Sequence, residues 1–149
     1  MINETRNAAV TRCNFDGNSS DNAGGRMANS SGNPTVTQCT FNGNSALFGG
    51  GMFNITSNPT ATHCTFTGNT FGFGGGMLNN ASNPTVTHCV FSSNVAVFLG
   101  GAMSNGASIP LVANCMLLRA TEERSLAEAG SNQGVLRAMR RKFTEQTAL

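Results

Sequence analysis

The stretch PTVTQCTFNGNSALFGGGMFN, residues 34–54, decides the fold because the chain repeats it at a nearly constant step. It returns as PTATHCTFTGNTFGFGGGMLN over residues 59–79. The cysteines mark the period, with spacings of 26, 25, 25 and 26 residues along the column Cys13, Cys39, Cys64, Cys89 and Cys115. Self-similarity at a fixed step of about 20–50 residues is the signature of a solenoid or a related repeat architecture.

Short runs within each unit alternate between apolar and polar residues. Val36 separates two threonines, and Cys39 and Phe41 flank another. Such alternation is typical of strands with one buried face, and the Asn-Gly and Gly-Gly steps are typical of turns. Gly, Asn, Thr and Pro are too frequent for helix interiors. We therefore predict three strands of three or four residues per unit, joined by three turns, with Val, Cys, Phe and Met side chains pointing inward.

Three short strands and three turns make one coil of a three-sided parallel β-helix. Coils stacked about 4.8 Å apart pair the backbone groups of each strand with the neighbouring coils. One coil cannot bury its apolar face alone, so several must stack. Leucine-rich repeats share the period but need a leucine framework that is missing here. The sequence therefore predicts an all-β, right-handed parallel β-helix (solenoid) of about four 25-residue coils over residues 1–118.

Charge separates this repeat from the end of the chain. No Asp, Glu, Lys or Arg occurs from Met27 to Leu118, whereas residues 119–149 carry six basic and four acidic residues. We expect residues 119–149 to be a charged helical tail that caps the open end of the solenoid; a disordered tail and a sequence foreign to the repeat are the alternatives. Nothing indicates a signal peptide, a membrane span or a nucleic-acid partner. Unpaired strand edges also allow end-to-end self-association.

One column of the repeat predicts a tight corner. It is the position just before each cysteine, and it holds Arg12, Gln38, His63, His88 and Asn114. A one-residue corner needs a left-handed backbone, where Asn and His are enriched. We therefore interpret His63 and His88 as corner residues and not as metal ligands or a proton-transfer pair. No carboxylate is close in sequence to orient either imidazole.

The remaining candidate chemistry is sparse. The five cysteines are expected to be packed thiols, with one or two disulfides between adjacent coils as the alternative. Their wide spacing does not suit zinc, and the Gly-rich turns lack the Asp that calcium repeats need. Acid–base catalysis needs paired carboxylates, which the central repeats lack. We therefore expect a non-enzyme with no catalytic residue, metal site or cofactor.

Threonines form the candidate binding surface. If Val36, Ala61 and Val86 face inward, three Thr-x-Thr pairs face outward as rows of hydroxyl groups. The rows comprise Thr35, Thr37, Thr60, Thr62, Thr85 and Thr87. This uncharged grid resembles the ice-binding face of some β-helical antifreeze proteins, and it could equally contact sugar hydroxyls. Thr is also a common residue of exposed strands, whatever its function.

Two motifs recur in phase in every unit. The first is F-x-x-N, at Phe15–Asn18, Phe41–Asn44, Phe66–Asn69 and Phe91–Asn94. The second is a Gly-Gly-x-Met or Gly-Gly-containing step, at Gly24–Met27, Gly49–Met52, Gly74–Met77 and Gly100–Met103. Over about residues 9–115 this resembles the repeats of the chlamydial polymorphic outer-membrane proteins. Their pattern pairs F-x-x-N with G-G-A followed by Ile, Leu or Val, whereas Met ends the motif here.

The resemblance implies a non-catalytic adhesin-like passenger of an autotransporter. It implies display at the cell surface or secretion, and a host-surface protein or a glycan as the partner. The alternative is a carbohydrate-binding β-helix related to polysaccharide lyases and hydrolases, which are similar in architecture. Selective sugar binding would favour that alternative.

Overall fold

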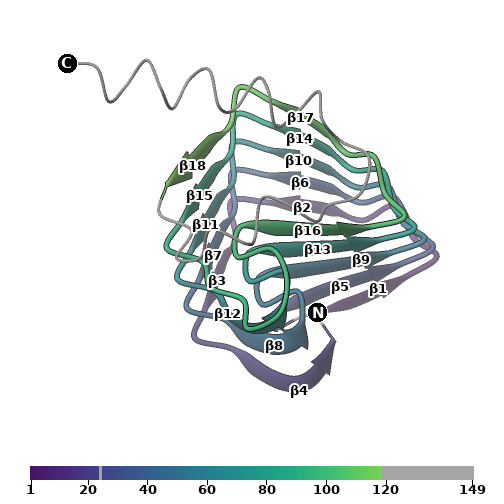
Figure 1. Ribbon diagram of the computed structural model, residues 1–149. Helices are drawn as coiled ribbons and strands as arrows, with labels where there is room; N and C mark the ends of the chain where they lie inside the picture. Colours follow the sequence, from purple (N-terminus) through teal and green to yellow (C-terminus); the bar gives the residue numbers. More distant parts are fainter. Residues whose placement is uncertain (24, 119–149) are drawn as a thin grey trace.

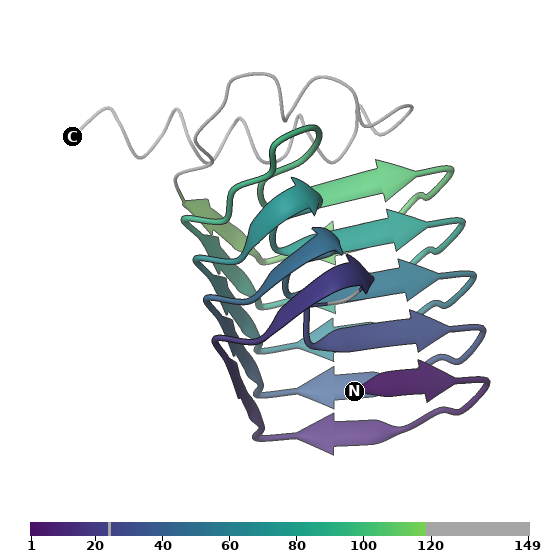
Figure 2. The same ribbon diagram turned by 90° about the horizontal axis from the view of Figure 1, so that it is seen from below.

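The computed structural model describes residues 1–23 and 25–118, which form 18 β-strands and no helix. All pairings between strands are parallel, and the strands of successive coils lie over one another (Figures 1 and 2). The predicted all-β solenoid of about four coils is therefore confirmed. The predicted cap, residues 119–149, lies outside the described residues.

Four sheets make up the walls of the solenoid. Sheet A contains β1 (Ile2–Glu4), β5 (Met27–Ser30), β9 (Met52–Ile55), β13 (Met77–Asn80) and β16 (Met103–Gly106). Sheet B contains β2 (Ala9–Thr11), β6 (Thr35–Thr37), β10 (Thr60–Thr62), β14 (Thr85–Thr87) and β17 (Leu111–Ala113). Sheet C contains β3 (Asn14–Asp16), β7 (Thr40–Asn42), β11 (Thr65–Thr67), β15 (Val90–Ser92) and β18 (Met116–Leu118). Sheet D contains β4 (Ser19–Ala23), β8 (Ser45–Phe48) and β12 (Thr70–Phe73).

Sheet D corrects the prediction of three strands per coil. The strand β8 follows the turn at Gly43 and buries Ala46 against the interior. Three of the coils therefore have four strands, and sheet D forms the short wall between sheets C and A (Figure 2).

The segment of each coil between sheets C and A also contains the two extra residues that make the cysteine spacing irregular. The first and fourth coils each have one additional residue between the Asn of F-x-x-N and the next Met. The first coil absorbs it as a register shift between Ser20 and Ala23 of β4. In the fourth coil residues 95–99 form no strand, and one isolated bridge joins Phe73 to Leu99. The extra residue therefore coincides with a register shift in the first coil and with the loss of the strand in the fourth.

The interior is built from in-register columns of identical residues. Val36, Cys39, Phe41 and Met52 are buried, as the alternation predicted. The inner Phe ladder, defined as Phe15, Phe41, Phe66 and Phe91, stacks its rings with centroids 4.6–4.8 Å apart. Identical side chains at the coil spacing let each ring pack against its neighbours above and below.

Two columns of asparagine are also buried, which the sequence analysis did not predict. Asn44 Nδ2 donates to Asn69 Oδ1 at 2.9 Å and to the Phe15 carbonyl oxygen at 2.9 Å. In the second column Asn54 Nδ2 donates to Asn79 Oδ1 at 2.8 Å. A buried amide is costly unless its hydrogen bonds are made, and neighbouring coils supply the partners in both columns except at Asn29 Oδ1, which is buried and accepts no hydrogen bond. The Asn ladders therefore hold the coils in register from inside.

Two backbone features make the tight turns possible. The corner residues Gln38, His63 and His88 have φ of 55°, 54° and 54°, so the predicted left-handed corner is confirmed. At the Gly-Gly steps the coils approach closely, because a Cβ on Gly51 would lie 2.6 Å from the Gly76 carbonyl oxygen. A larger residue there would push neighbouring coils apart.

Candidate functional site

The structure brings all six predicted threonines together on the outer surface of sheet B. The strands β6, β10 and β14 pair in register, so each Thr lies directly over its equivalent in the next coil. Val36, Ala61 and Val86 between them point into the core. This surface is called the Thr face, and it comprises Thr35, Thr37, Thr60, Thr62, Thr85 and Thr87. Rows one coil apart are separated by about 4.8 Å, and the two columns by about 6.6 Å.

The Thr face has defined ends. Thr11 pairs with Thr37 and extends one column by a coil, whereas Ala9 ends the other column. At the opposite end Leu111 and Ala113 replace the threonines. Within the grid, Thr62 Oγ1 and Thr87 Oγ1 are 3.4 Å apart and share a hydrogen bond. Each hydroxyl has one proton and two lone pairs, so these groups keep capacity for a ligand.

The corner column borders the Thr face. The imidazole rings of His63 and His88 stack with centroids 5.0 Å apart and an interplanar angle of 9°. Asn114 Nδ2 lies 3.4 Å from His88 Nε2. Because the lone pair of an imidazole nitrogen lies in the plane of its ring, two nearly parallel stacked rings do not direct their nitrogens at one ion. Within residues 1–23 and 25–118, no group of three or more His, Cys, Asp or Glu could hold a metal ion.

A second outer surface is aromatic, and it was not predicted from the sequence. Phe48, Phe73 and Phe98 form the outer Phe ladder, with ring centroids 5.8 and 4.9 Å apart. The ring centroid of Phe53, on sheet A, lies 6.0 Å from the ring centroid of Phe48. The 25-residue step between these phenylalanines was visible in the sequence, so the column could have been found. Since both faces of Phe73 lie against neighbours, this ring offers mainly its edge to a ligand, whereas Phe98 at the end of the ladder is more exposed.

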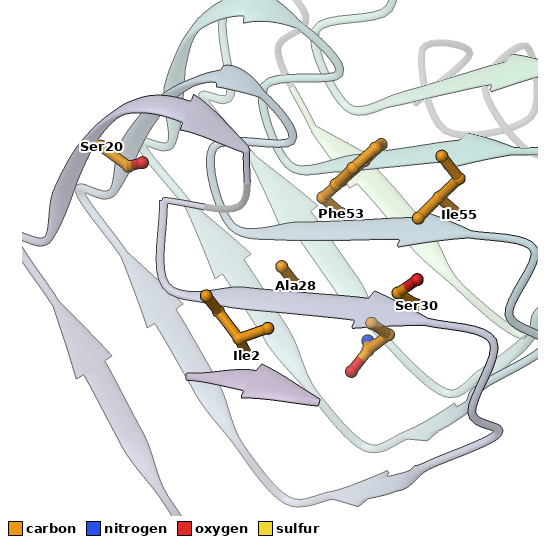
Figure 3. Close-up of a pocket in the computed structure, with 7 residues that line it drawn as sticks. Ile2, Ser20, Ala28, Ser30, Phe53 and Ile55 are labelled. Atoms are coloured by element: carbon orange, nitrogen blue, oxygen red, sulfur yellow. The ribbon is translucent and has the colours of Figure 1, made fainter. Parts of the chain in front are cut away.

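Next to this ladder the outer surface of sheet A is hollowed. The depression holds about 390 Å³ and is lined by Ile2, Ser20, Ala28, Asn29, Ser30, Phe53 and Ile55 (Figure 3). In Figure 3 Phe53 and Ile55 stand side by side on one strand, and Ser20 comes from the curled strand of sheet D. The lining has no ionisable side chain, so the depression offers apolar contact but no acid or base.

The carboxylates of the described residues are few and scattered. Glu4, Asp16 and Asp21 lie on β1, β3 and β4, which belong to three different sheets. Asp16 Oδ1 accepts a hydrogen bond from Asn42 Nδ2 at 2.8 Å. None of the three therefore shares a sheet with another.

The cysteine column runs along the corner between sheets B and C. All five thiols are free; Cys39, Cys64 and Cys89 are buried, Cys115 is half-buried and Cys13 is exposed. Burial raises the pKa of the Cys39 thiol. This is the packing expected of small hydrophobic side chains, except at the two ends of the column.

Comparison with known proteins gives one match. The family model described as "Right handed beta helix region" matches residues 1–135. No curated protein and no solved structure matches the chain significantly. In the part of the chain that the structure describes, no helix is long and apolar enough to cross a membrane.

Proposed function

The chain belongs to the right-handed β-helix family, and from this premise we propose that it is a non-catalytic scaffold of a surface-displayed or secreted, adhesin-like protein. The Thr face carries the proposal: six hydroxyl groups at regular spacing on a rigid sheet, with Arg12 of the first coil as the charged residue of the bordering corner column. The resemblance to the polymorphic outer-membrane repeats supports the adhesive role and the location.

The non-catalytic part of the proposal rests on the placement of ionisable groups. Acid–base and glycosidic chemistry need two carboxylates held within about 5–10 Å of each other across a substrate. Glu4, Asp16 and Asp21 lie in different walls of the first coil, and the Thr face contains no ionisable side chain. His63 and His88 border that face without a carboxylate partner on their own corner column.

The low charge of the repeats also indicates which class of partner the Thr face would bind. Uronate, sialic acid, sulfate and phosphate groups are normally bound by Arg or Lys. From Met27 to Leu118 the chain has neither, and Arg12 at the edge of the Thr face donates its Nε–H to Gln38 Oε1 at 3.0 Å, so the proposed partner is a neutral protein surface or a neutral glycan. Carbohydrate binding is the second candidate function, because outward hydroxyl groups can exchange hydrogen bonds with sugar hydroxyls.

The test measures binding of the full chain to cell surfaces, to isolated surface proteins and to an array of neutral and acidic glycans. We expect Thr60→Val with Thr62→Val to abolish binding, because the change removes hydroxyls and keeps the strand-forming shape. The matched control is Thr65→Val with Thr67→Val on the outer surface of sheet C in the same coil. An equal loss of binding in both variants would show that the Thr face is not the binding surface.

Two further outcomes separate the candidates. Selective binding to neutral sugars without binding to surface proteins would favour the carbohydrate-binding function over the adhesin-like one. Release of new reducing ends from a polysaccharide by the purified chain would overturn the non-catalytic proposal.

A further inference from the structure

The outer surface of the solenoid changes character in the last coil that the structure describes. Four outward-facing columns hold mainly Thr, Asn, Ser or Asp in the earlier coils, and each ends in a large apolar residue. In sheet B, for example, Leu111 lies over Thr85, and in sheet C Leu118 lies over Ser92. The four residues are exposed and are called the terminal apolar surface, which comprises Ile109, Leu111, Met116 and Leu118.

This surface lies on the side of the coil and not on its open end. Successive residues of a strand point to opposite faces, so Val112 and Leu117 point inward between the exposed residues. Both are half-buried and pack against the core. A segment laid across the open end would cover Val112 and Leu117 and would leave Leu111 and Met116 in water. Contiguous exposed apolar surface marks an interaction site, and here the site is the outer side of the coil.

The chain itself supplies an apolar segment next to this surface. The strand β18 ends at Leu118, and the C-terminal segment follows it directly. Within that segment, apolar residues recur at the three- and four-residue spacing of one helix face, at Leu136, Met139 and Phe143. We call these three residues the apolar helix face. An isolated helix of this length is marginal in water and is stabilised mainly when its apolar face packs on a surface.

Tethering favours this segment over any other occupant. Residues 119–135 span up to about 55 Å when extended, so they can return Leu136 to either side of the last coil. A segment tethered this closely has an effective concentration in the millimolar range. A second copy of the chain or a separate protein must be that concentrated to compete. From Met27 to Leu118 there is no Lys or Arg, so the four basic residues of the range 137–142 meet no like charge on these coils.

We propose that the C-terminal segment folds back over the outer side of the last coil and packs its apolar helix face against the terminal apolar surface. The contact covers the side of the coil, whereas the cap predicted from the sequence would cover its open end. It also fixes where the Thr face ends, because Leu111 continues one of the two Thr columns. The contact does not depend on the proposed binding function.

The first test places a photoreactive residue on the apolar helix face of the full chain, as Phe143→p-benzoylphenylalanine. Irradiation and mass spectrometry of the digest should find cross-links to Leu111, Met116 or Leu118. A mixture of ¹⁴N- and ¹⁵N-labelled protein should show that each cross-link joins residues of the same chain. The matched control is Arg141→p-benzoylphenylalanine, about 200° away around a helix, which should give few cross-links to these residues.

Three outcomes of this test would overturn the proposal. Cross-links to Val112 or Leu117 would mean that the segment lies across the open end. Cross-links between differently labelled chains would mean that a second copy covers the surface. A lack of cross-links to the last coil would mean that the C-terminal segment does not dock there.

The second test measures hydrogen exchange of the full chain by mass spectrometry. The variant Met116→Thr with Leu118→Ser restores the residue types that Thr65 and Ser92 have in the same columns, so the strand keeps its pattern. We expect the amides of residues 134–145 to exchange about tenfold faster in this variant, because the docked segment is released. The control Asn14→Thr with Asp16→Ser makes the same residues at the equivalent positions of the first coil and should leave that exchange unchanged. Unchanged exchange in the first variant, or equal acceleration in both, would refute the contact and leave the proposed function of the Thr face untouched.

Discussion

The inner and outer Phe ladders use the same residue at the same step and differ in confinement. In the middle of the inner ladder the Phe41 and Phe66 rings are 4.6 Å apart and within 2° of parallel. In the outer ladder the Phe73 and Phe98 rings are 4.9 Å apart and tilted by 28°. The inner rings are enclosed by the walls of the solenoid, whereas Phe98 is 61% exposed. A repeated Phe at the same step is therefore enough to stack the rings, and enclosure by the walls of the solenoid makes them parallel.

The end of the inner ladder supports this explanation. Phe15 lies in the first coil and is tilted by 26° against Phe41, although it is only 7% exposed. It has a ring on one side only, and the Arg26 guanidinium lies 5.7 Å from its centroid. At the other end Phe91 lies opposite Leu117 of the next coil and stays within 3° of Phe66, so a ring is held parallel where side chains pack on both of its faces and tilts where one face lacks them. The difference in ring tilt between the two ladders therefore comes from packing on all sides, because the residue is Phe in both.

The largest expected difference is in stability. Phe66→Ala should lower the free energy of unfolding by about 3–5 kcal/mol, because it removes a fully buried ring and leaves a cavity. Phe73→Ala in the same coil should cost about 1 kcal/mol, because that ring is only partly buried. Urea unfolding of both variants measures the difference, and Phe66→Leu provides a milder form if Phe66→Ala does not fold. Equal losses would mean that the outer ladder stabilises the solenoid as much as the core does.

The buried Asn ladder beside the inner rings should show the next largest effect. Asn69→Ala removes the acceptor for the Asn44 N–H and side-chain amide, and the donor to the Phe41 carbonyl oxygen. Buried groups left without partners cost about 1–3 kcal/mol each, so we expect a loss of about 2–4 kcal/mol. The control Asn42→Ala removes one exposed hydrogen bond to Asp16 and should change stability by less than about 0.5 kcal/mol. A small loss for Asn69→Ala would show that solvent reaches the ladder.

The fourth coil offers a way to make the outer ladder more regular. Deletion of Leu99 removes the extra residue and restores the step that β8 and β12 share. We expect a fourth strand in sheet D, an untilted Phe98 ring and a gain of about 1 kcal/mol from recovered backbone hydrogen bonds. Binding of a hydrophobic dye should fall, since residues 95–99 include the exposed side chains of Val97 and Phe98. Deletion of Leu47, in a coil without the insertion, is the control and should destabilise the protein.

The two ladders also show what could be predicted from the sequence. The inner ladder was predictable because Cys39 and Phe41 alternate with threonines in every unit, which fixes the buried face. The stretches that form sheet D differ from coil to coil, as SSDNA, SALF and TFGF, and no shared alternation marks them as strands. Asn44 was interpreted as part of a turn because Asn-Gly-Asn is a turn sequence. Its burial depends on partners in neighbouring coils, which a single unit does not reveal.

The smallest expected effect concerns a third stack of rings, formed by His63 and His88 on the exposed corner. His63→Asn removes the stacking but keeps a residue that tolerates the left-handed backbone, so stability should change by less than about 0.5 kcal/mol. His63→Val should cost about 1–3 kcal/mol, because a β-branched residue is strained at a φ of 54°. Urea unfolding of both variants measures the two changes in the free energy of unfolding. A loss above about 1 kcal/mol for His63→Asn would mean that exposed ring stacking contributes to stability without enclosure, and the explanation of the two Phe ladders would then be wrong.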